Sequence, residues 1–117
     1  MKQPIWTPSQ KKIEKSQMTR FMNYVNSSRH LSLKNYEDLF TWSIKEIPSF
    51  WESVWEFCEV KSSTSFSQIV DDASKMPGAK WFPGAQLNYA ENLLRFNDSK
   101  AAIIFKGELE AESLCFA

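Results

Sequence analysis

The sequence predicts a mainly helical chain over residues 7–97 that is followed by a β-hairpin. Apolar residues recur at three- and four-residue intervals, as on one face of a helix, and each such stretch follows a residue that caps helices well. At residues 101–105 the pattern changes to a short continuous apolar run, which is typical of a buried strand. Aromatic residues make up 15% of the chain, so large ring surfaces must find partners.

The first helix is predicted to begin near residue 8. Thr7 can cap it, Pro8 suits the first helical position where no N–H is needed, and Gln10 completes a capping box. The helical pattern continues to about Asn26, with a break around residues 16–19. Its apolar positions are Ile13, Met18, Phe21, Met22 and Val25.

Two further helix starts are predicted in the next third of the chain. Asn35 with Asp38 indicates one start, and Pro48 is expected to end that helix. Ser49 with Glu52 forms a second capping box. The helix behind it carries apolar residues on a wide face, which we expect to be covered on more than one side. These residues are Phe50, Trp51, Val54, Trp55, Phe57 and Cys58.

A long loop is predicted between these helices and the last one. Residues 61–68 form a polar, serine-rich connector without periodicity. Pro-Gly pairs at residues 77–78 and 83–84 fit type II turns. The two turns bracket Trp81 and Phe82, which we expect to be held in a constrained loop.

The last part of the chain is predicted to form a helix and then a hairpin. Asn88 with Glu91 indicates a helix that ends near residues 97–98. Residues 101–105 and 113–116 read as two strands. Because two strands alone are marginally stable in water, this hairpin is expected to begin a larger sheet.

Composition narrows the classes of partner. Fourteen basic and fourteen acidic side chains give a net charge of zero, which argues against a nucleic acid or an anionic membrane as partner. Cys58 and Cys115 fall in apolar runs and are expected to be buried, reduced thiols. The first twenty residues contain no apolar run long enough for a secretory signal or a membrane span. We therefore expect a cytosolic protein.

A search for nucleotide and metal sites yields no candidate. Gly78, Gly84 and Gly107 lie too far apart to form a phosphate-binding loop. The single histidine, His30, has no cysteine or carboxylate at metal-ligand spacing. His30 could act as a base, but a solvated position just past a helix end is the favoured interpretation.

Other reactive residue types also have simpler explanations. Ser63 and Ser65 could be nucleophiles, yet no base is placed near them. Trp42, Trp51 and Trp55 could cage a cation, although packing is favoured. Several carboxylates are better explained by helix starts and solvated faces than by acid–base catalysis. They are Glu37, Asp38, Glu52, Glu56, Asp71 and Asp72. We assign no catalytic, cofactor-binding or metal-binding residue.

One motif resembles a known family. Residues 80–94, KWFPGAQLNYAENLL, are similar to a signature of acetoacetyl-CoA synthetases, in the acetyl-CoA synthetase-like branch of AMP-forming adenylating enzymes. Asn92 is followed by Leu-Leu-Arg-Phe, where acetyl- and propionyl-CoA synthetases usually have Leu-Asp-Arg-His, and this favours the acetoacetyl subgroup. Nearly all of the chain shares the resemblance. The other similar segments are residues 6–9, 18–22, 36–43, 50–55 and 101–105.

The resemblance implies a ligase that activates acetoacetate with Mg-ATP as an acyl-adenylate and then transfers the acyl group to CoA, for cytosolic lipid synthesis. Residues 1–97 would be its helical N-terminal region, and residues 98–117 the first β-hairpin of a largely missing α/β adenylate-forming domain. ATP, Mg and CoA would bind to that later domain. The motif residues would be structural, with Trp81 and Phe82 against the large domain and Asn88 capping a helix. They are Trp81, Phe82, Gly84, Leu87, Asn88 and Asn92.

Three origins of the chain stay open at this point. It could be an N-terminal fragment, from a truncated gene model or a splice product, that is inactive alone. It could instead be a standalone helical interaction module that docks its tryptophan face on a partner. A short paralogue that regulates the full-length ligase is the third alternative.

Overall fold

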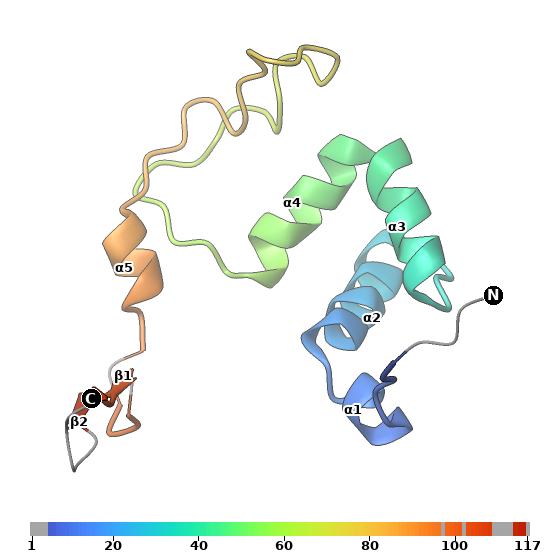
Figure 1. Cartoon of the computed structure of the whole chain (residues 1–117). Helices are drawn as coiled ribbons and strands as arrows, with labels where there is room; N and C mark the ends of the chain where they lie inside the picture. The colour runs from blue at the N-terminus through green and yellow to red at the C-terminus, as the bar shows by residue number, and fades with distance from the viewer. Residues whose placement is uncertain (1–4, 97, 102, 109–113, 117) are drawn as a thin grey trace.

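The computed structural model describes the chain apart from residues 1–4, 97, 102, 109–113 and 117, and for residues 114–116 it describes the backbone alone. The described part is mainly helical, with one short pair of strands (Figure 1). The elements are α1 (Gln10–Glu14), α2 (Gln17–Arg29), α3 (Tyr36–Lys45), α4 (Ile47–Phe57), α5 (Tyr89–Leu93), β1 (Ile103–Phe105) and β2 (Leu114–Phe116).

The first helix begins later than predicted. Helix α1 starts directly after Ser9, its N-terminal cap residue, which has an extended backbone. The carbonyl of Ser9 accepts hydrogen bonds from the N–H groups of Lys12 and Ile13. The predicted cap at Thr7 is therefore wrong, because Thr7 and Pro8 lie before the helix.

The predicted break in the first helix is present, but it lies at residues 15–16 and not over residues 16–19, because residues 17–19 already belong to α2. Helix α1 ends at Glu14, and the hydroxyl of Ser16 caps α2 by accepting a 3.1 Å hydrogen bond from the N–H of Thr19. Helix α2 then runs to Arg29, three residues past the predicted end at Asn26, and stops at His30 in the left-handed conformation with φ 54°.

The connection from α2 to α3 is fixed by local hydrogen bonds. The side-chain amide of Asn26 donates to the carbonyl of Leu33 at 2.9 Å and accepts from its N–H at 2.8 Å. Asn35 caps α3 as predicted, accepting from the N–H of Asp38 at 3.0 Å. The carboxylate of Asp38 in turn accepts from the N–H of Lys34 at 2.9 Å, so both side chains fix the start of the helix.

The predicted boundary at Pro48 is wrong. Helix α3 ends at Lys45, and Pro48 lies in the first turn of α4, with Glu46 as the shared residue between the helices. Proline suits a first turn because its φ is already helical and its missing N–H would have no partner there. Ser49 consequently lies inside α4 and does not cap it.

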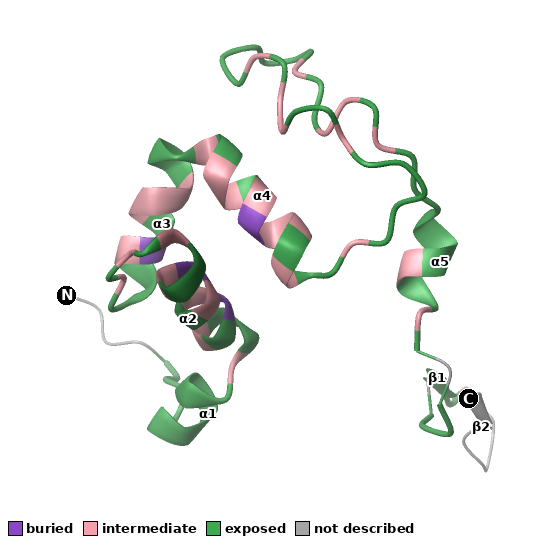
Figure 2. Ribbon diagram, turned by 180° about the vertical axis from the view of Figure 1, so that it is seen from behind, coloured by how far each residue is buried: buried purple, intermediate pink, exposed green. Residues whose placement is uncertain are grey.

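Helix α4 lies against α2 and α3 through aromatic side chains. The ring of Phe21 packs edge-on to Phe50 and Phe57, with centroids 5.9 and 5.2 Å apart, and Trp42 lies 5.9 Å from Phe50. Tyr24 lies 5.6 Å from Phe57. Among the described residues, the buried apolar side chains are those of Phe21, Val25 and Leu39, on α2 and α3 beside this contact (Figure 2).

A polar network crosses the same contact. Ser53 on α4 is fully buried, and its hydroxyl donates to the carbonyl of Ser49 at 2.8 Å. The Nε of Arg29, at the end of α2, donates to the Ser53 hydroxyl at 3.2 Å. The Nη2 of Arg29 also pairs with Glu52 at 2.8 Å and with Glu56 at 3.3 Å. Arg29 therefore joins the end of α2 to one face of α4.

The end of the chain differs from the prediction in its boundaries. Helix α5 is capped by Asn88 as predicted, but it ends at Leu93 and not near residues 97–98. The predicted strand pair is confirmed: β1 runs antiparallel to β2, with Ile104 opposite Cys115. Strand β1 begins at Ile103, and the predicted first residue of the second strand, Ser113, lies outside the described residues.

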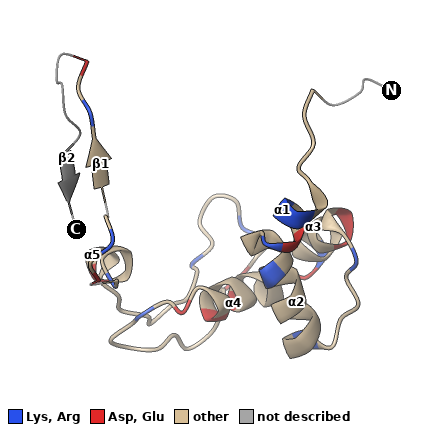
Figure 3. Cartoon of the chain, turned by 90° about the horizontal axis from the view of Figure 1, so that it is seen from below, with Lys and Arg blue, Asp and Glu red and all other residues tan. Residues whose placement is uncertain are grey.

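The chain is more open than a compact monomer of its mass. Its accessible surface is 10029 Å², whereas a folded monomer of 13.6 kDa is expected to expose about 6,600 Å². Its radius of gyration is 19.1 Å, against about 13 Å for a compact domain of this length. Basic and acidic residues are interspersed along the chain (Figure 3), so the extra surface carries no strong charge of one sign.

We expect Ser53→Ala to destabilise the chain by about 1 kcal/mol relative to Ser43→Ala, because only the first change removes buried hydrogen bonds. The hydroxyl of Ser43 makes a similar bond to the carbonyl of Phe40, but on the surface of α3. Both changes replace serine by alanine inside a helix, so the gain in helix propensity is the same for the two and cancels in the comparison. Urea denaturation followed by tryptophan fluorescence measures the difference, and equal free energies of unfolding would refute the role of Ser53.

The stability of the helical part is expected to fall in strong alkali. Burial raises the pKa of the Tyr24 phenol above its ordinary value near 10, and its 2.8 Å hydrogen bond to Glu56 raises it further. Neutral Tyr24 therefore stabilises the fold fully below the ordinary pKa, and this stability is lost as the pH rises through the folded value. Urea midpoints measured at pH 8 and at about pH 11 should drop more for the native chain than for Tyr24→Phe. An equal drop in both would show that Tyr24 does not contribute.

Candidate functional site

The loop that contains the sequence motif folds back on itself. Residues 61–87, which we call the aromatic loop, pair across two isolated bridges, Thr64 with Gln86 and Val70 with Trp81. Its two limbs run side by side between α4 and α5 (Figure 1). The predicted serine-rich connector is thus one limb, and the Trp-Phe-Pro-Gly motif belongs to the other.

Aromatic rings fasten this loop to α4. Trp55 lies 4.6 Å from Phe82 and 5.3 Å from Phe66, and these two phenylalanines are themselves 5.3 Å apart. Trp51 meets Trp81 at 6.0 Å. The wide apolar face of α4 is therefore covered on a second side, as predicted. Trp81 is still 40% exposed beside α4, so packing of Trp81 and Phe82 on a large domain stays a prediction.

The Pro-Gly turn at residues 83–84 shapes the motif. Gly84 has φ 91°, and the N–H of Ala85 donates to the carbonyl of Phe82 at 3.1 Å, as a type II turn requires. Phe82 itself has φ 49°, which is unfavourable for a bulky side chain. Its N–H donates to the carbonyl of Ile69 at 2.7 Å. The opposite limb and the ring contact with Trp55 therefore hold Phe82 in this conformation.

Asp71 fixes the far end of the aromatic loop. One carboxylate oxygen accepts from the N–H of Lys80 at 2.8 Å and from the N–H of Asp72 at 2.7 Å, and the other pairs with Lys75 at 3.3 Å. The hydrogen bond from Lys80 is the main reason that the pKa of Asp71 lies below its usual range, with Asp72 and Lys75 adding to it. Asp71 serves here as a charged acceptor that closes a turn.

Two polar side chains attach α5 to the end of α4. The amide of Asn92 donates to the carbonyl of Lys61 and accepts from its N–H, both at 2.8 Å, and also donates to the carbonyl of Asn88 at 3.0 Å. Arg95 donates from Nη1 to the carbonyl of Cys58 at 2.7 Å and to the next carbonyl at 3.1 Å. The positive charge of Arg95 is also attracted by the partial negative charge at the C-terminus of α4.

The residues considered as reactive groups are dispersed. His30 is exposed at the end of α2, as interpreted from the sequence. Ser63 donates its hydroxyl to the carbonyl of Gln86 at 3.1 Å. Cys58 is exposed, not buried as predicted, because it follows the last turn of α4; the side chain of Cys115 lies outside the described residues.

The three tryptophans considered as a cation cage pack against other aromatic rings. Trp42 packs against Phe50 on the side of α4 that faces α2 and α3. Trp51 and Trp55 meet the aromatic loop. Phe50 lies between two of them, 5.9 Å from Trp42 and 5.3 Å from Trp51. All three rings therefore pack on other aromatic side chains, which is the favoured interpretation of the sequence.

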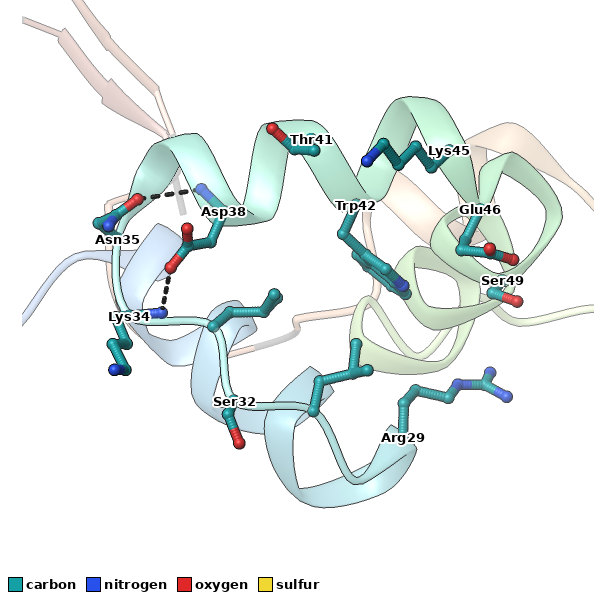
Figure 4. A pocket seen from close by; sticks show the side chains of 12 residues that line it. Arg29, Ser32, Lys34, Asn35, Asp38, Thr41, Trp42, Lys45, Glu46 and Ser49 are labelled. Atoms are coloured by element: carbon teal, nitrogen blue, oxygen red, sulfur yellow. Dashed lines mark hydrogen bonds between the residues drawn. The ribbon is translucent and has the colours of Figure 1, made fainter.

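A pocket of about 960 Å³, lined by both charged and apolar side chains, opens between the end of α2, α3 and the start of α4 (Figure 4). Arg29, Lys34 and Lys45 line it together with Asp38 and Glu46, so its charges are mixed. Figure 4 shows Asp38 held at the helix start by the hydrogen bonds described above. Within the described ranges, no three histidine, cysteine, aspartate or glutamate side chains are grouped to hold a metal ion.

A second, smaller pocket of about 360 Å³ is apolar. It lies between α2, α3 and α4, and Phe21, Phe40 and Phe57 are among its lining residues. Its size and lining suit an apolar side chain, not a reacting group. Among the described helices, none is both long and apolar enough to cross a bilayer.

Comparisons with known proteins agree with the motif. Residues 36–93 match the family model "Acetyl-coenzyme A synthetase N-terminus". An acetoacetyl-CoA synthetase of Danio rerio is 38% identical over 110 residues, which cover 92% of this chain and 16% of that protein. A malonamoyl-CoA synthetase of Penicillium aethiopicum is 42% identical over 80 residues, which cover 68% of this chain and 11% of that protein.

The fold agrees as well. The solved structure of an acetoacetyl-CoA synthetase from Streptomyces lividans superposes with a TM-score of 0.74 and 39% identity, over 80% of this chain and 15% of that one. The chain thus spans about a sixth of the length of the curated relatives it matches. It belongs to the acetoacetyl-CoA synthetase family of acid–thiol ligases, and it corresponds to the N-terminal region of that family.

Proposed function

We propose that this chain serves as the N-terminal region of an AMP-forming acetoacetate–CoA ligase. The observation that carries the proposal is the 38% identity to an acetoacetyl-CoA synthetase over 92% of this chain. In such a ligase, acetoacetate attacks the α-phosphate of ATP and forms acetoacetyl-AMP with release of pyrophosphate. The thiol of CoA then displaces AMP to give acetoacetyl-CoA. The ligase would act in the cytosol.

Within that ligase, this segment has a structural role. ATP and CoA phosphates need clustered backbone N–H groups, and the three glycines of this chain lie far apart in sequence. The described residues also contain no group of three histidine, cysteine, aspartate or glutamate side chains that could hold a metal ion. The cofactors would therefore be held by residues outside this segment, and β1 with β2 would open the large adenylating domain.

A related acid is a second candidate substrate. One relative is a malonamoyl-CoA synthetase, and it is 42% identical to this chain over 80 residues. Malonamate and acetoacetate share a carboxylate separated by one CH₂ from a second carbonyl group. Acetoacetate is favoured, because the matches to acetoacetyl-CoA synthetases cover more of this chain.

The full-length protein is expected to form AMP and pyrophosphate with acetoacetate, Mg-ATP and CoA. Its kcat/KM for acetoacetate should exceed that for acetate by at least about tenfold, because a site built to bind the second carbonyl rejects an acid without it. It should also exceed that for malonamate, in which an NH₂ group replaces the methyl group of acetoacetate. Coupled assays of AMP release measure all three acids. No turnover of any of them would refute the ligase, and a preference for malonamate would refute the substrate.

We expect Asn92→Ala in the full-length ligase to lower its melting temperature while KM for acetoacetate and for ATP stays within about twofold. The change removes the hydrogen bonds to Lys61 that attach α5 but no group in contact with a substrate. Asn23→Ala, an exposed position on α2, is the matched control and should leave both quantities unchanged. A large change in KM for Asn92→Ala would contradict a purely structural role.

A further inference from the structure

Although the exposed surface as a whole is balanced in charge, the first third of the chain is not. Residues 1–35 contain seven basic side chains and one acidic side chain, whereas residues 36–117 contain seven basic and thirteen acidic side chains. The net charge of zero thus averages a positive N-terminal part and a negative remainder, and it argues against an anionic partner only for the chain as a whole. An asymmetry of this kind is typical of a chain whose positive end meets an anionic surface.

The positive charges are concentrated around the corner between α1 and α2. Within residues 11–20 there are four basic side chains and a single carboxylate, that of Glu14. The four basic residues are Lys11, Lys12, Lys15 and Arg20. All four are exposed, and among the described residues none of them pairs with a carboxylate. Their charges are therefore available to a partner, unlike that of Arg29, which pairs with Glu52 and Glu56.

Exposed apolar side chains are interleaved with these cations. Before α1, Ile5 is fully exposed and Trp6 is 67% exposed. On the two helices, Ile13 and Met18 are 43% and 49% exposed. The ammonium group of Lys12 lies 5.6 Å from the centroid of the Trp6 ring, so this ring lies beside α1. Cationic and apolar groups thus share one part of the surface, residues 5–20, which we call the basic corner.

The basic corner is braced by hydrogen bonds and lies away from the strands. The hydroxyl of Thr19 donates to the carbonyl of Ile13 at 2.6 Å, and the hydroxyl of Ser16 caps α2, so α1 is fixed against the start of α2. Figures 1 and 2 show α1 on the opposite side of α4 from α5 and the strands, and Figure 3 shows basic residues on α1. A partner that approaches α1 therefore does not meet α5 or the strand pair.

We propose that the basic corner is a docking surface for an anionic lipid bilayer, on which the chain lies without crossing it. Each lysine or arginine near such a surface is attracted by the negative headgroups. Tryptophan favours the boundary between headgroups and acyl chains, and aliphatic side chains beside it are buried at the same depth. The proposal goes beyond the ligase function and does not depend on it.

A nucleic acid fits the basic corner less well than a bilayer does. Its phosphates would attract the same cations. Its backbone, however, offers no apolar layer in which Ile5, Ile13 and Met18 could be buried, and these side chains would stay in water. A bilayer with anionic headgroups complements both the charge and the apolar groups of the corner.

Vesicle sedimentation tests the proposal with the 117-residue chain. The chain should bind vesicles of equal parts phosphatidylserine and phosphatidylcholine at least about tenfold more tightly than vesicles of phosphatidylcholine alone. Added NaCl should weaken the binding to the charged vesicles, because salt screens the attraction. Equal affinity for the two kinds of vesicle, or binding to neither, would overturn the proposal.

Paired substitutions test whether the position of the charges matters. Lys11→Gln combined with Lys15→Gln should weaken binding to the charged vesicles by about thirtyfold, since each cation contributes about fivefold. The matched control combines Lys45→Gln with Lys61→Gln, which removes the same net charge at two exposed positions outside the corner. It should change the affinity by less than about twofold. Equal weakening by both pairs would assign the binding to net charge and overturn the docking surface.

A third substitution separates a bilayer from other polyanions. Trp6→Ser should weaken binding to the charged vesicles by at least about fivefold, because the ring no longer enters the headgroup boundary. Tyr89→Ser, at an exposed aromatic position of α5, is the control and should have no such effect. If Trp6→Ser had no effect and polyuridylate RNA bound as tightly as the charged vesicles, the corner would be a general polyanion site and the lipid proposal would be overturned.

Discussion

The fold depends on helix α4, whose aromatic residues pack on two sides. Phe50 and Phe57 meet α2 and α3, while Trp51 and Trp55 meet the aromatic loop. Such ring pairs contribute about 0.5–1.5 kcal/mol each beyond the area they bury. Because few other side chains of the described residues are fully buried, these contacts carry most of the tertiary structure. Without α4, the N-terminal helices and the motif loop would share no surface.

Polar groups at the ends of the helices fix how the parts are oriented around α4. Arg29 joins the end of α2 to Glu52 and Ser53, and Arg95 binds carbonyls at the end of α4. Hydrogen bonds are directional, so they fix the orientation of these segments relative to α4, which apolar contacts alone would not do. The result is a helical scaffold in which most side chains of α5 and β1 are exposed. Chemistry in this family would then depend on the segment through position and not through reacting groups.

Local features were predictable from sequence and distant contacts were not. Asn35 and Asn88 were identified as caps because a cap acts within three residues. Pro48 was misplaced because proline suits both a helix end and a first turn, and only the contact between α3 and α4 decides. The pairing of Trp55 with Phe82 joins residues far apart in the chain, and no spacing rule connects them. The structural importance of Arg95 was missed for the same reason, whereas Asn92 was signalled by its motif.

The central claim is that this segment acts as the front of a larger ligase, and the mass of the endogenous protein tests it most directly. An antibody raised against residues 61–80, which form part of the exposed aromatic loop, can be used on native cell extract. We expect a band roughly six times heavier than 13.6 kDa, in proportion to the 16% of its relatives that the chain matches. A band only near 13.6 kDa would contradict it and direct attention to a binding partner of a short protein.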